Sequence, residues 1–306
     1  MRTVIFDLDG TLADTSADLI AAANACFRDL GHRDLLDPVD DALTAFHGGR
    51  AMLRLGFSRL GAPGEASVDR EYPRLLSFYE AAIDRETTLY PGAVSAVEAL
   101  RQAGFVTGIC TNKPERLAAI LLDRLGVRHL FGSLVGADTL PVRKPDPAPY
   151  RASVERAGGA VSRSMLIGDT ETDRRTAEAA GVPVALVTFG PEGRGVARLS
   201  PEALLERFDD LPAPVADLRE TDDVAVEIAL VGDDVTVRFD GVVVTHRRVG
   251  HRPTGEYLTI SVRGQVGARS RARVVGAQVV PLKGTGRTAA TGRDRAASST
   301  RGRASR

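Results

Sequence analysis

The feature that most constrains the fold is an apolar stretch near the N-terminus that ends in two carboxylates. Val4, Ile5 and Phe6 are followed by Asp7 and Asp9, and a glycine comes next. A short run rich in β-branched residues that ends at a glycine is typical of a buried parallel strand. In open α/β sheets, ligands bind beyond the carboxyl ends of such strands. The sequence therefore predicts a site at the end of its first strand.

The pair Asp7 and Asp9 has two interpretations. Two aspartates in this pattern are, by themselves, more often ordinary strand-end and turn residues. Close carboxylates repel each other, however, so a cation or a shared proton is expected where they meet. Carboxylate oxygens suit a hard ion such as Mg²⁺. The remainder of the chain favours the second interpretation.

Strands and helices alternate along the chain after residue 91. Apolar runs typical of strands lie at residues 106–110, 134–135, 165–167 and 184–187, each preceded by a helical pattern. This alternation predicts an α/β fold with a doubly wound parallel sheet, that is, a Rossmann-like core. The core is expected to comprise residues 1–13 and 87–214.

Residues 14–86 lack a convincing strand and show helical patterns at 15–30, 51–60 and 68–85. Asp14, Thr15 or Ser16 is expected to cap the first of these helices. The segment separates the first strand from the rest of its sheet. It is therefore predicted to form an inserted α-helical cap above the sheet.

Three more polar clusters follow predicted strands. Thr111 and Asn112 follow the strand at 106–110, Lys144 lies in the loop after the next strand, and a pair of aspartates follows residue 167. Because the carboxyl ends of parallel strands share one edge of the sheet, these clusters should converge on Asp7. Lys113, beside Asn112, is expected to be an ordinary surface lysine that at most orders its loop.

These residues suit phosphoryl transfer to water. Asp7 is the predicted nucleophile, because a carboxylate can form an aspartyl phosphate. Asp9 is predicted to protonate the leaving oxygen and then to deprotonate the attacking water. Asp169, with Asp7 and a backbone carbonyl near Asp9, is predicted to bind Mg²⁺.

The other polar residues have supporting tasks in this hypothesis. Thr111 and Asn112 offer donors to the phosphoryl oxygens, and Lys144 neutralises them together with the Asp7 carboxylate. Asp173 lies one helical turn after Asp169, so it is expected to support the metal or Lys144 without binding the metal directly.

Four segments also carry a family resemblance: residues 7–11 (Asp-Leu-Asp-Gly-Thr), 111–113 (Thr-Asn-Lys), 143–145 (Arg-Lys-Pro) and 168–173 (Gly-Asp-Thr-Glu-Thr-Asp). In order and spacing they resemble the four motifs of the haloacid dehalogenase superfamily. Within it, the chain is most similar to the phosphoglycolate phosphatases. The resemblance covers roughly residues 1–214 and implies a helical cap over the α/β core.

Residue by residue, the resemblance implies the same roles. The nucleophile is Asp7 and the acid/base is Asp9, with Thr111 and Lys144 on the phosphate. The implied Mg²⁺ ligands are Asp7, Asp169 and Asp9 through its carbonyl. Dehalogenases of the superfamily lack an acid/base aspartate at the position of Asp9, which argues against a dehalogenase.

The cap is expected to set the choice of substrate, because it closes over the sheet and excludes water. Gly48 and Gly49 form a turn before Arg50 and the helix at 51–60. A helix N-terminus with an adjacent arginine can hold a small carboxylate, which would suit 2-phosphoglycolate. The alternative is that the glycines form only a turn and that Arg50 is a solvated helix start.

Composition narrows the class of protein. Lys+Arg and Asp+Glu number 40 each, so the formal net charge of +0 gives no general attraction to nucleic acid or membrane. The two cysteines do not suggest a disulfide framework, and from the sequence pattern we expect neither a signal peptide nor a membrane-spanning segment. We expect a soluble cytoplasmic enzyme, monomer or homodimer, whose partner is a small phosphorylated substrate.

The segment after residue 214 breaks the pattern. Runs at 224–230, 235–239, 242–245 and 257–262 are typical of short strands, so residues 215–283 are predicted to form a small β module or a non-native extension. Residues 284–306 contain many arginines and almost no apolar residues, which predicts a disordered basic tail.

Two alternatives to a 2-phosphoglycolate phosphatase remain at this point. The first keeps the chemistry and changes the substrate to a sugar phosphate, pyrophosphate or, as a mutase, a hexose phosphate. The second is a nucleic-acid-binding protein that uses the basic tail. The intact set of Asp7, Asp9, Lys144 and Asp169 argues against the second.

Overall fold

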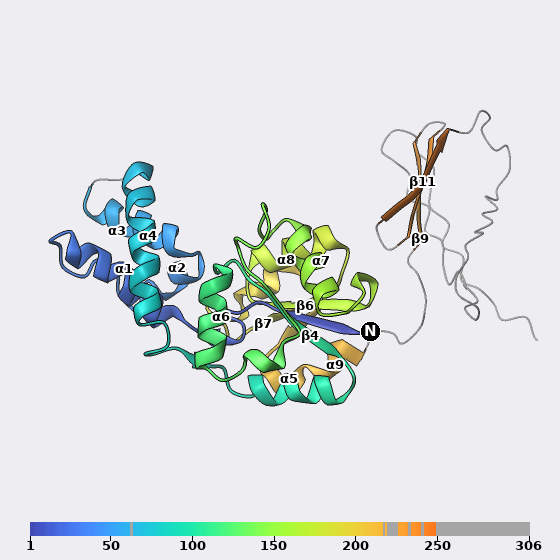
Figure 1. Ribbon diagram of the computed structural model, residues 1–306, viewed down its shortest axis with the longest axis horizontal. Coiled ribbons are helices and arrows are strands. Elements are labelled where there is room, and N and C mark those ends of the chain that lie inside the picture. Colours follow the sequence, from blue (N-terminus) through green and yellow to red (C-terminus); the bar gives the residue numbers. More distant parts are fainter. Residues whose placement is uncertain (62–63, 217, 219–225, 232–233, 240–241, 249–306) are drawn as a thin grey trace, which may run out of the picture. The chain divides into compact units, whose positions relative to one another are not determined.

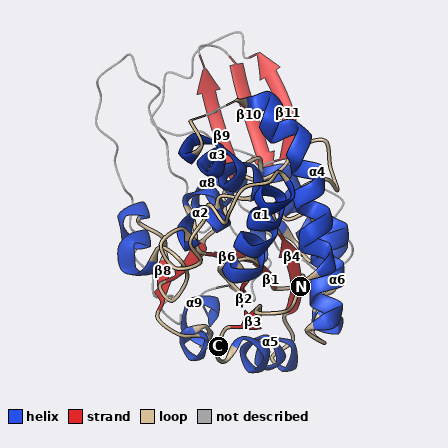
Figure 2. Ribbon diagram, turned by 90° about the vertical axis from the view of Figure 1, so that its left-hand side faces the viewer, coloured by secondary structure: helices blue, strands red, loops and turns tan. Residues whose placement is uncertain are grey.

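The computed structural model describes residues 1–61, 64–216, 218, 226–231, 234–239 and 242–248. Its first unit, residues 1–220, contains a six-stranded parallel sheet in the order β5-β4-β1-β6-β7-β8 (Figures 1 and 2). The strands are β1 (Thr3–Phe6), β4 (Val106–Cys110), β5 (Ser133–Val135), β6 (Ser164–Gly168), β7 (Val184–Val187) and β8 (Ala203–Leu205). The first strand of the chain thus lies inside the sheet, and the predicted α/β fold class is confirmed.

Helices cover both faces of this sheet (Figure 1). On β1, Val4 and Phe6 pack into one hydrophobic cluster and Ile5 into the other. Successive strand residues point to opposite faces, so burial on both sides explains the unbroken apolar run. The helices of this part are α5 (Ala93–Gln102), α6 (Glu115–Arg124), α7 (Pro147–Arg156), α8 (Glu171–Ala180) and α9 (Pro212–Ala216).

Strand β8 was not predicted from the sequence. Its three residues are all apolar but none is β-branched, and Leu204 at its centre is exposed at the edge of the sheet, so the sequence does not mark it as a strand. Within the part of the chain that the structure describes, four 3₁₀ turns complete the connections, at Arg128–Leu130, Val161–Arg163, Gly193–Leu199 and Phe208–Asp210. Among the described helices, none has both the length and the apolar character to cross a bilayer.

In its described residues, the insert after β1 contains four helices, α1 (Ser16–Asp29), α2 (Ala42–Phe46), α3 (Gly49–Arg59) and α4 (Glu65–Ala81). Helices α1 and α4 form the main packed pair, and Phe27 of α1 meets Phe57 of α3 edge to face at 5.3 Å. Helix α2, with five residues, was not predicted. The division of the chain into a cap at 14–86 and a core at 1–13 and 87–214 stays a prediction.

The two connections between the insert and the sheet lie side by side. Strands β2 (Ala13–Asp14) and β3 (Thr88–Leu89) pair antiparallel. Asp18, which is buried in the first turn of α1, accepts hydrogen bonds from the backbone N–H groups of Glu86 and Thr87 and from the Thr87 hydroxyl, at 2.8–3.1 Å. This carboxylate therefore fastens the returning connection to the outgoing one.

A second unit follows residue 220. In it, β9 (Val226–Val231), β10 (Asp234–Phe239) and β11 (Val242–Arg248) form an antiparallel sheet in the order β11-β10-β9. These strands agree with three of the runs found in the sequence. The expected strand at 257–262 and the expected basic tail at 284–306 lie outside the described residues.

The Asp18 contacts predict a large effect of one substitution. Asp18→Ala leaves the N–H groups of Glu86 and Thr87 without their acceptor, so the free energy of unfolding should fall by about 3 kcal/mol. Urea unfolding measures this. As a control, Asp34→Ala removes an exposed ion pair with Arg28 and should change the free energy by less than about 1 kcal/mol. Equal effects of the two substitutions would contradict this account.

Candidate active site

The parallel register brings the strand ends together. Phe6 of β1 is in register with Ile109 of β4 and Ile167 of β6. The Asp7 N–H donates to the Ile167 carbonyl at 2.9 Å, so the ladder continues for one residue past the strand. Polar residues that follow these strands therefore reach one edge of the sheet. At this edge lie the predicted site residues Asp7, Thr111 and Asp169.

Lys144 is the cation at the centre of this edge. Its side chain is 1% exposed, and its Nζ lies 2.6 Å from Asp173 Oδ1 and 3.1 Å from Asp7 Oδ2. Burial alone lowers the pKa of Lys144, but the attraction of Asp173 and Asp7 raises it above the ordinary value. The ammonium group therefore stays charged between two carboxylates.

Asp173 is fully engaged by the protein. Its Oδ1 accepts from Lys144, and its Oδ2 accepts from the Thr170 N–H and hydroxyl and from the Asp169 N–H, at 2.8–3.2 Å. A Cβ at Gly168 would lie 2.3 Å from the Asp173 carboxyl carbon, so a larger residue there would displace this carboxylate. Asp173 thus holds Lys144 and also caps the N-terminus of helix α8, where its carboxylate accepts from the N-cap residue Thr170.

Asp169 is less well satisfied. Its Oδ1 accepts from the Thr11 hydroxyl at 2.7 Å, whereas its buried Oδ2 has no hydrogen-bond partner among the described residues. Gly10, with a φ of +80°, approaches closely: a Cβ at that position would lie 2.3 Å from this same oxygen. One carboxylate oxygen from each of Asp7, Asp169 and Asp173 lies within 4.8 Å of the others.

This cluster fits a hard divalent cation. Three ionised carboxylates and one ammonium group leave two negative charges in a buried place, which is costly without a counter-charge. Asp173 already accepts four hydrogen bonds. Asp7 has one contact on each oxygen, from the Leu8 N–H at 2.8 Å and from Lys144 at 3.1 Å, and Asp169 Oδ2 has none among the described residues. Asp169 and Asp7 are therefore the carboxylates with the most capacity left for a metal. Oxygen donors of this kind are those that Mg²⁺ and similar ions prefer.

The acid groups respond to this crowding. Burial raises the pKa of Asp7 to about 6, with repulsion from Asp173 and Asp9 in the same direction and Lys144 opposing it. Burial and the repulsion of Asp173 and Asp7 also raise the pKa of Asp169 well above its usual range. Both shifts describe the protein without a cation, and a bound cation would reverse them.

Asp9 lies in a different environment from Asp7. Its Oδ1 accepts from the Thr15 hydroxyl and from the Lys113 ammonium group, each at 2.7 Å. The expectation that Lys113 is an ordinary surface lysine is wrong, because its side chain is only 3% exposed. Burial alone lowers the pKa of Lys113, but Asp9 raises it above the ordinary value. Thr15, at the N-cap of α1, makes no side-chain cap bond and serves Asp9 instead.

Thr111 and Asn112 lie in the loop after β4. Thr111 is buried, and its Oγ1 accepts from the Lys113 N–H at 3.2 Å. Asn112 donates from Nδ2 to the Lys144 carbonyl at 3.1 Å, which links this loop to the one that carries Lys144. Both residues line the pocket described next, although one Asn112 donor is engaged within the protein.

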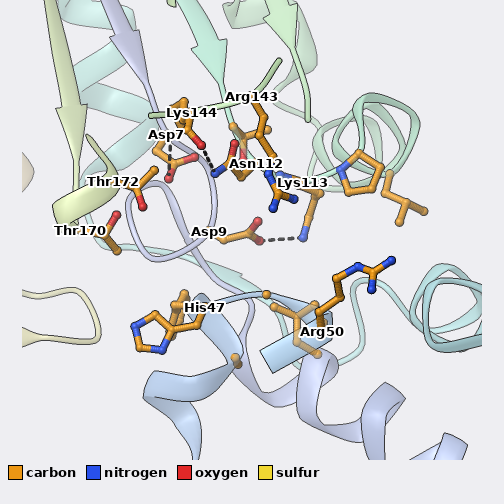
Figure 3. A pocket seen from close by; sticks show the side chains of 18 of the residues that line it. Asp7, Asp9, His47, Arg50, Asn112, Lys113, Arg143, Lys144, Thr170 and Thr172 are labelled. Carbon is orange, nitrogen blue, oxygen red and sulfur yellow. Dashed lines mark hydrogen bonds and ion pairs between the residues drawn. The ribbon is translucent and has the colours of Figure 1, made fainter. Parts of the chain in front are cut away.

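A pocket of about 620 Å³ joins this edge of the sheet to the insert. In Figure 3, Asp9 lies in the middle of the pocket. Asp7 and Lys144 lie on one side of it, and His47 and Arg50 of the insert lie on the other side. Arg50 pairs with Asp69 at 2.5 Å, and its guanidinium lies 4.7 Å over the Tyr72 ring. The structure therefore brings every predicted site residue except Asp169 and Asp173 to the pocket lining, and those two lie behind Asp7 and Lys144.

Several residues of the site were not predicted. Thr11 lies in the first motif but was given no role, and Thr15 was expected only to cap a helix. Both hydroxyls lie close in the sequence to Asp7 and Asp9, and this closeness was the signal that could have identified them. Tyr79 on α4 lines the pocket beside Lys113. No local signal marks Tyr79, because its place depends on how the insert packs above the sheet.

A comparison with protein-family sequence models matches residues 1–181, more than half of the chain, to the haloacid dehalogenase-like hydrolases. This chain belongs to the haloacid dehalogenase-like hydrolases. It is an enzyme that hydrolyses phosphate monoesters, and enzymes of this family work with a divalent metal ion.

The region shared with the relatives of known name spans most of the length of each relative. A phosphoglycolate phosphatase of Agrobacterium fabrum is 39% identical over 67% of this chain and 88% of its own, and one of Mesorhizobium japonicum is 36% identical over 70% and 94%. Among solved structures, a predicted phosphoglycolate phosphatase from Haemophilus somnus has a TM-score of 0.63 at 23% identity, over 70% of this chain and 97% of that one. The structural likeness supports the fold.

The raised pKa of Asp7 predicts a pH-dependent gain in stability for Asp7→Asn in metal-free protein. Folding favours the protonated form of Asp7. The contribution of this form to the free energy of unfolding is fully present below pH 3.8 and is lost as pH rises through about 6. In EDTA at pH 8 the variant should exceed the parent in free energy of unfolding by about 3 kcal/mol, and by roughly half of that at pH 5.

Denaturant unfolding of both proteins at the two pH values measures this difference. Asp123→Asn, at an exposed position on α6, is the matched control and should leave the free energy within about 0.5 kcal/mol of the parent value. A variant that is less stable than the parent by the same amount at both pH values would show that Asp7 is not a strained carboxylate.

Proposed function

We propose that this enzyme hydrolyses 2-phosphoglycolate to glycolate and phosphate with Mg²⁺, through a phosphorylated Asp7. One observation carries the mechanism: Asp7 lies 3.1 Å from the buried Lys144 ammonium and beside Asp169, at the base of a pocket that the insert lines from the other side. The substrate is supported by the names of the relatives, which are phosphoglycolate phosphatases.

The first half of the reaction phosphorylates the enzyme. An oxygen of Asp7 attacks phosphorus, the new O–P bond forms, and the bond from phosphorus to the glycolate oxygen breaks. Asp9 gives a proton to that leaving oxygen, which departs as the glycolate hydroxyl. Lys144 keeps Asp7 ionised and balances charge on the phosphoryl oxygens.

The second half restores Asp7. A water molecule attacks the phosphorus of the aspartyl phosphate, Asp9 takes a proton from this water, and the bond between the Asp7 oxygen and phosphorus breaks to release phosphate. The same carboxyl group of Asp9 therefore acts first as acid and then as base. Thr111 and Asn112 donate to the phosphoryl oxygens in both halves.

Asp7, Asp169 and the Asp9 carbonyl are the proposed ligands of Mg²⁺. When bound, the ion supplies positive charge to the phosphoryl oxygens and to the crowded carboxylates. The unpartnered Asp169 Oδ2 is the observation in favour of this assignment. Asp173 is proposed to act on Lys144, because its two oxygens already accept four hydrogen bonds, whereas Asp7 has one contact on each oxygen.

Arg50 is the proposed partner of the substrate carboxylate. It lines the pocket at the start of α3, and its present partner Asp69 has a side chain that is 63% exposed. Such an exposed ion pair contributes little free energy, so a buried substrate carboxylate can replace it. The stacking of Arg50 on Tyr72 would hold the guanidinium in place during that exchange.

Phosphate release from a panel of monoesters tests this proposal. The panel should contain 2-phosphoglycolate, a sugar phosphate, a hexose phosphate and pyrophosphate, each with Mg²⁺ and with EDTA. We expect the highest kcat/KM for 2-phosphoglycolate, no release in EDTA, and a loss of at least about 10³-fold in Asp7→Asn. Arg50→Met should raise KM for 2-phosphoglycolate about tenfold with little change in kcat.

The outcomes separate mechanism from substrate. Greater release from another ester, lost in the same way in Asp7→Asn, would retain the mechanism and reject 2-phosphoglycolate. Unchanged release by Asp7→Asn would reject the nucleophile. Asp123→Asn serves again as the control and should retain the activity of the parent.

A further inference from the structure

The site contains a second buried lysine, Lys113, whose carboxylate partner differs from that of Lys144. The Lys113 side chain is 3% exposed, and its Nζ lies 2.7 Å from Asp9 Oδ1. Lys144 instead contacts Asp7 and Asp173. A buried ammonium group requires a paired charge, and for Lys113 that charge is Asp9. The two lysines therefore serve the two aspartates of the first motif separately.

The contacts of Asp9 are confined to one of its oxygens. Thr15 and Lys113 both donate to Oδ1, and within the described part of the chain no hydrogen bond reaches Oδ2. Two donors on one oxygen fix the orientation of the carboxylate and leave the other oxygen free. A residue that alternates between acid and base needs such an arrangement, because one oxygen must exchange a proton while the group stays in place.

The insert covers Lys113 from the opposite side. Its Nζ lies 4.5 Å from the centre of the Tyr79 ring on α4. Tyr79 is 1% exposed, so its ring excludes water from the ammonium group. A cation against an aromatic face is stabilised most when both are desolvated. Lys113, which follows β4 in the core, thus contacts Asp9 and a helix of the insert at once.

Figure 3 shows Lys113 extended toward Asp9, with the dashed contact between them inside the pocket. A direct role on the phosphoryl group is less consistent with this geometry, because Asp9 and the Tyr79 ring already engage the ammonium group. Lys144 already offers a cation beside Asp7.

We propose that Lys113 is a positioning residue for Asp9: it holds Oδ1 so that Oδ2 meets the reacting oxygen, and Tyr79 keeps it there. This inference rests on the proposed function, since it assigns a geometry to the acid/base step. Lys113 and Tyr79 then tie proton transfer to the packing of the insert over the sheet. No bond to Lys113 forms or breaks in the reaction.

A double-mutant cycle on kcat tests the proposal. Lys113→Met keeps the length of the side chain and removes the charge, and it should lower kcat roughly 10- to 100-fold with KM changed less than about threefold. Asp9→Asn should lower kcat about 10²- to 10⁴-fold. The double variant should be no slower than Asp9→Asn, because Lys113 acts only through Asp9. A further loss of about tenfold or more in the double variant would overturn the proposal.

The leaving group provides an independent readout. The p-nitrophenolate group of p-nitrophenyl phosphate departs without a proton, so the burst of p-nitrophenol at the first turnover does not need Asp9 as an acid. Lys113→Met should slow this burst less than about threefold while it slows turnover of the alkyl ester strongly. A loss in the rate of this burst equal to the loss in turnover of the alkyl ester would show that Lys113 does not act through proton transfer.

Two further variants guard against a failure to fold. Lys113→Arg retains the cation and should recover at least part of the activity that Lys113→Met loses. Tyr79→Leu removes the aromatic face and should lower kcat about 3- to 10-fold, with no added loss in the Lys113→Met background. Lack of rescue by arginine, or additive losses with Tyr79→Leu, would contradict the proposal.

Apart from the burst with p-nitrophenyl phosphate, these measurements use the alkyl ester that the parent enzyme hydrolyses fastest. If 2-phosphoglycolate is not the substrate, the ester panel with the parent enzyme shows it. If Lys113 does not position Asp9, only the double-mutant cycle shows it. The two results are therefore distinguishable.

Discussion

The buried contact of Lys144 with Asp7 and Asp173 is the interaction on which the site depends. Without this ammonium group, three carboxylates would crowd the end of the central strands, and the cost of burying them would rise steeply. Asp173 in turn caps α8, and Gly168 makes room for it. Among the described residues, this arrangement leaves Asp169 Oδ2 without a partner and Asp7 with one contact on each oxygen, so these two carboxylates can best receive a cation.

The insert adds a second layer to this arrangement. It begins at paired short strands, where Asp18 fastens its two connections. From that attachment it supplies Thr15 and Tyr79 to the surroundings of Asp9, and Arg50 to the far wall of the pocket. The insert therefore supplies Arg50, the proposed partner of the substrate carboxylate, and shares the surroundings of Asp9 with Lys113 of the core.

The fold was largely predictable because most strands of the main sheet are marked by short local patterns in the sequence. Continuous apolar runs marked five of the six strands of the main sheet, and polar residues at their ends marked the site edge. Helix α2 was missed because its five residues are too few for a helical pattern. Strand β8 was missed because its short apolar run contains no β-branched residue and its central Leu204 is exposed. The burial of Lys113 was mispredicted for another reason: it depends on α4 packing above the sheet, and a single sequence does not encode that contact in any local pattern.

The central claim is that the buried carboxylates of this site require a divalent cation. Calorimetric titration with Mg²⁺ tests it most directly, in the parent and in Asp169→Asn, with the melting temperature followed in parallel. The account predicts that Mg²⁺ binds the parent and raises its melting temperature, and that Asp169→Asn binds at least about tenfold more weakly. Metal-free Asp169→Asn should melt at or above the temperature of the metal-free parent. Equal Mg²⁺ affinity in the two proteins would contradict the claim.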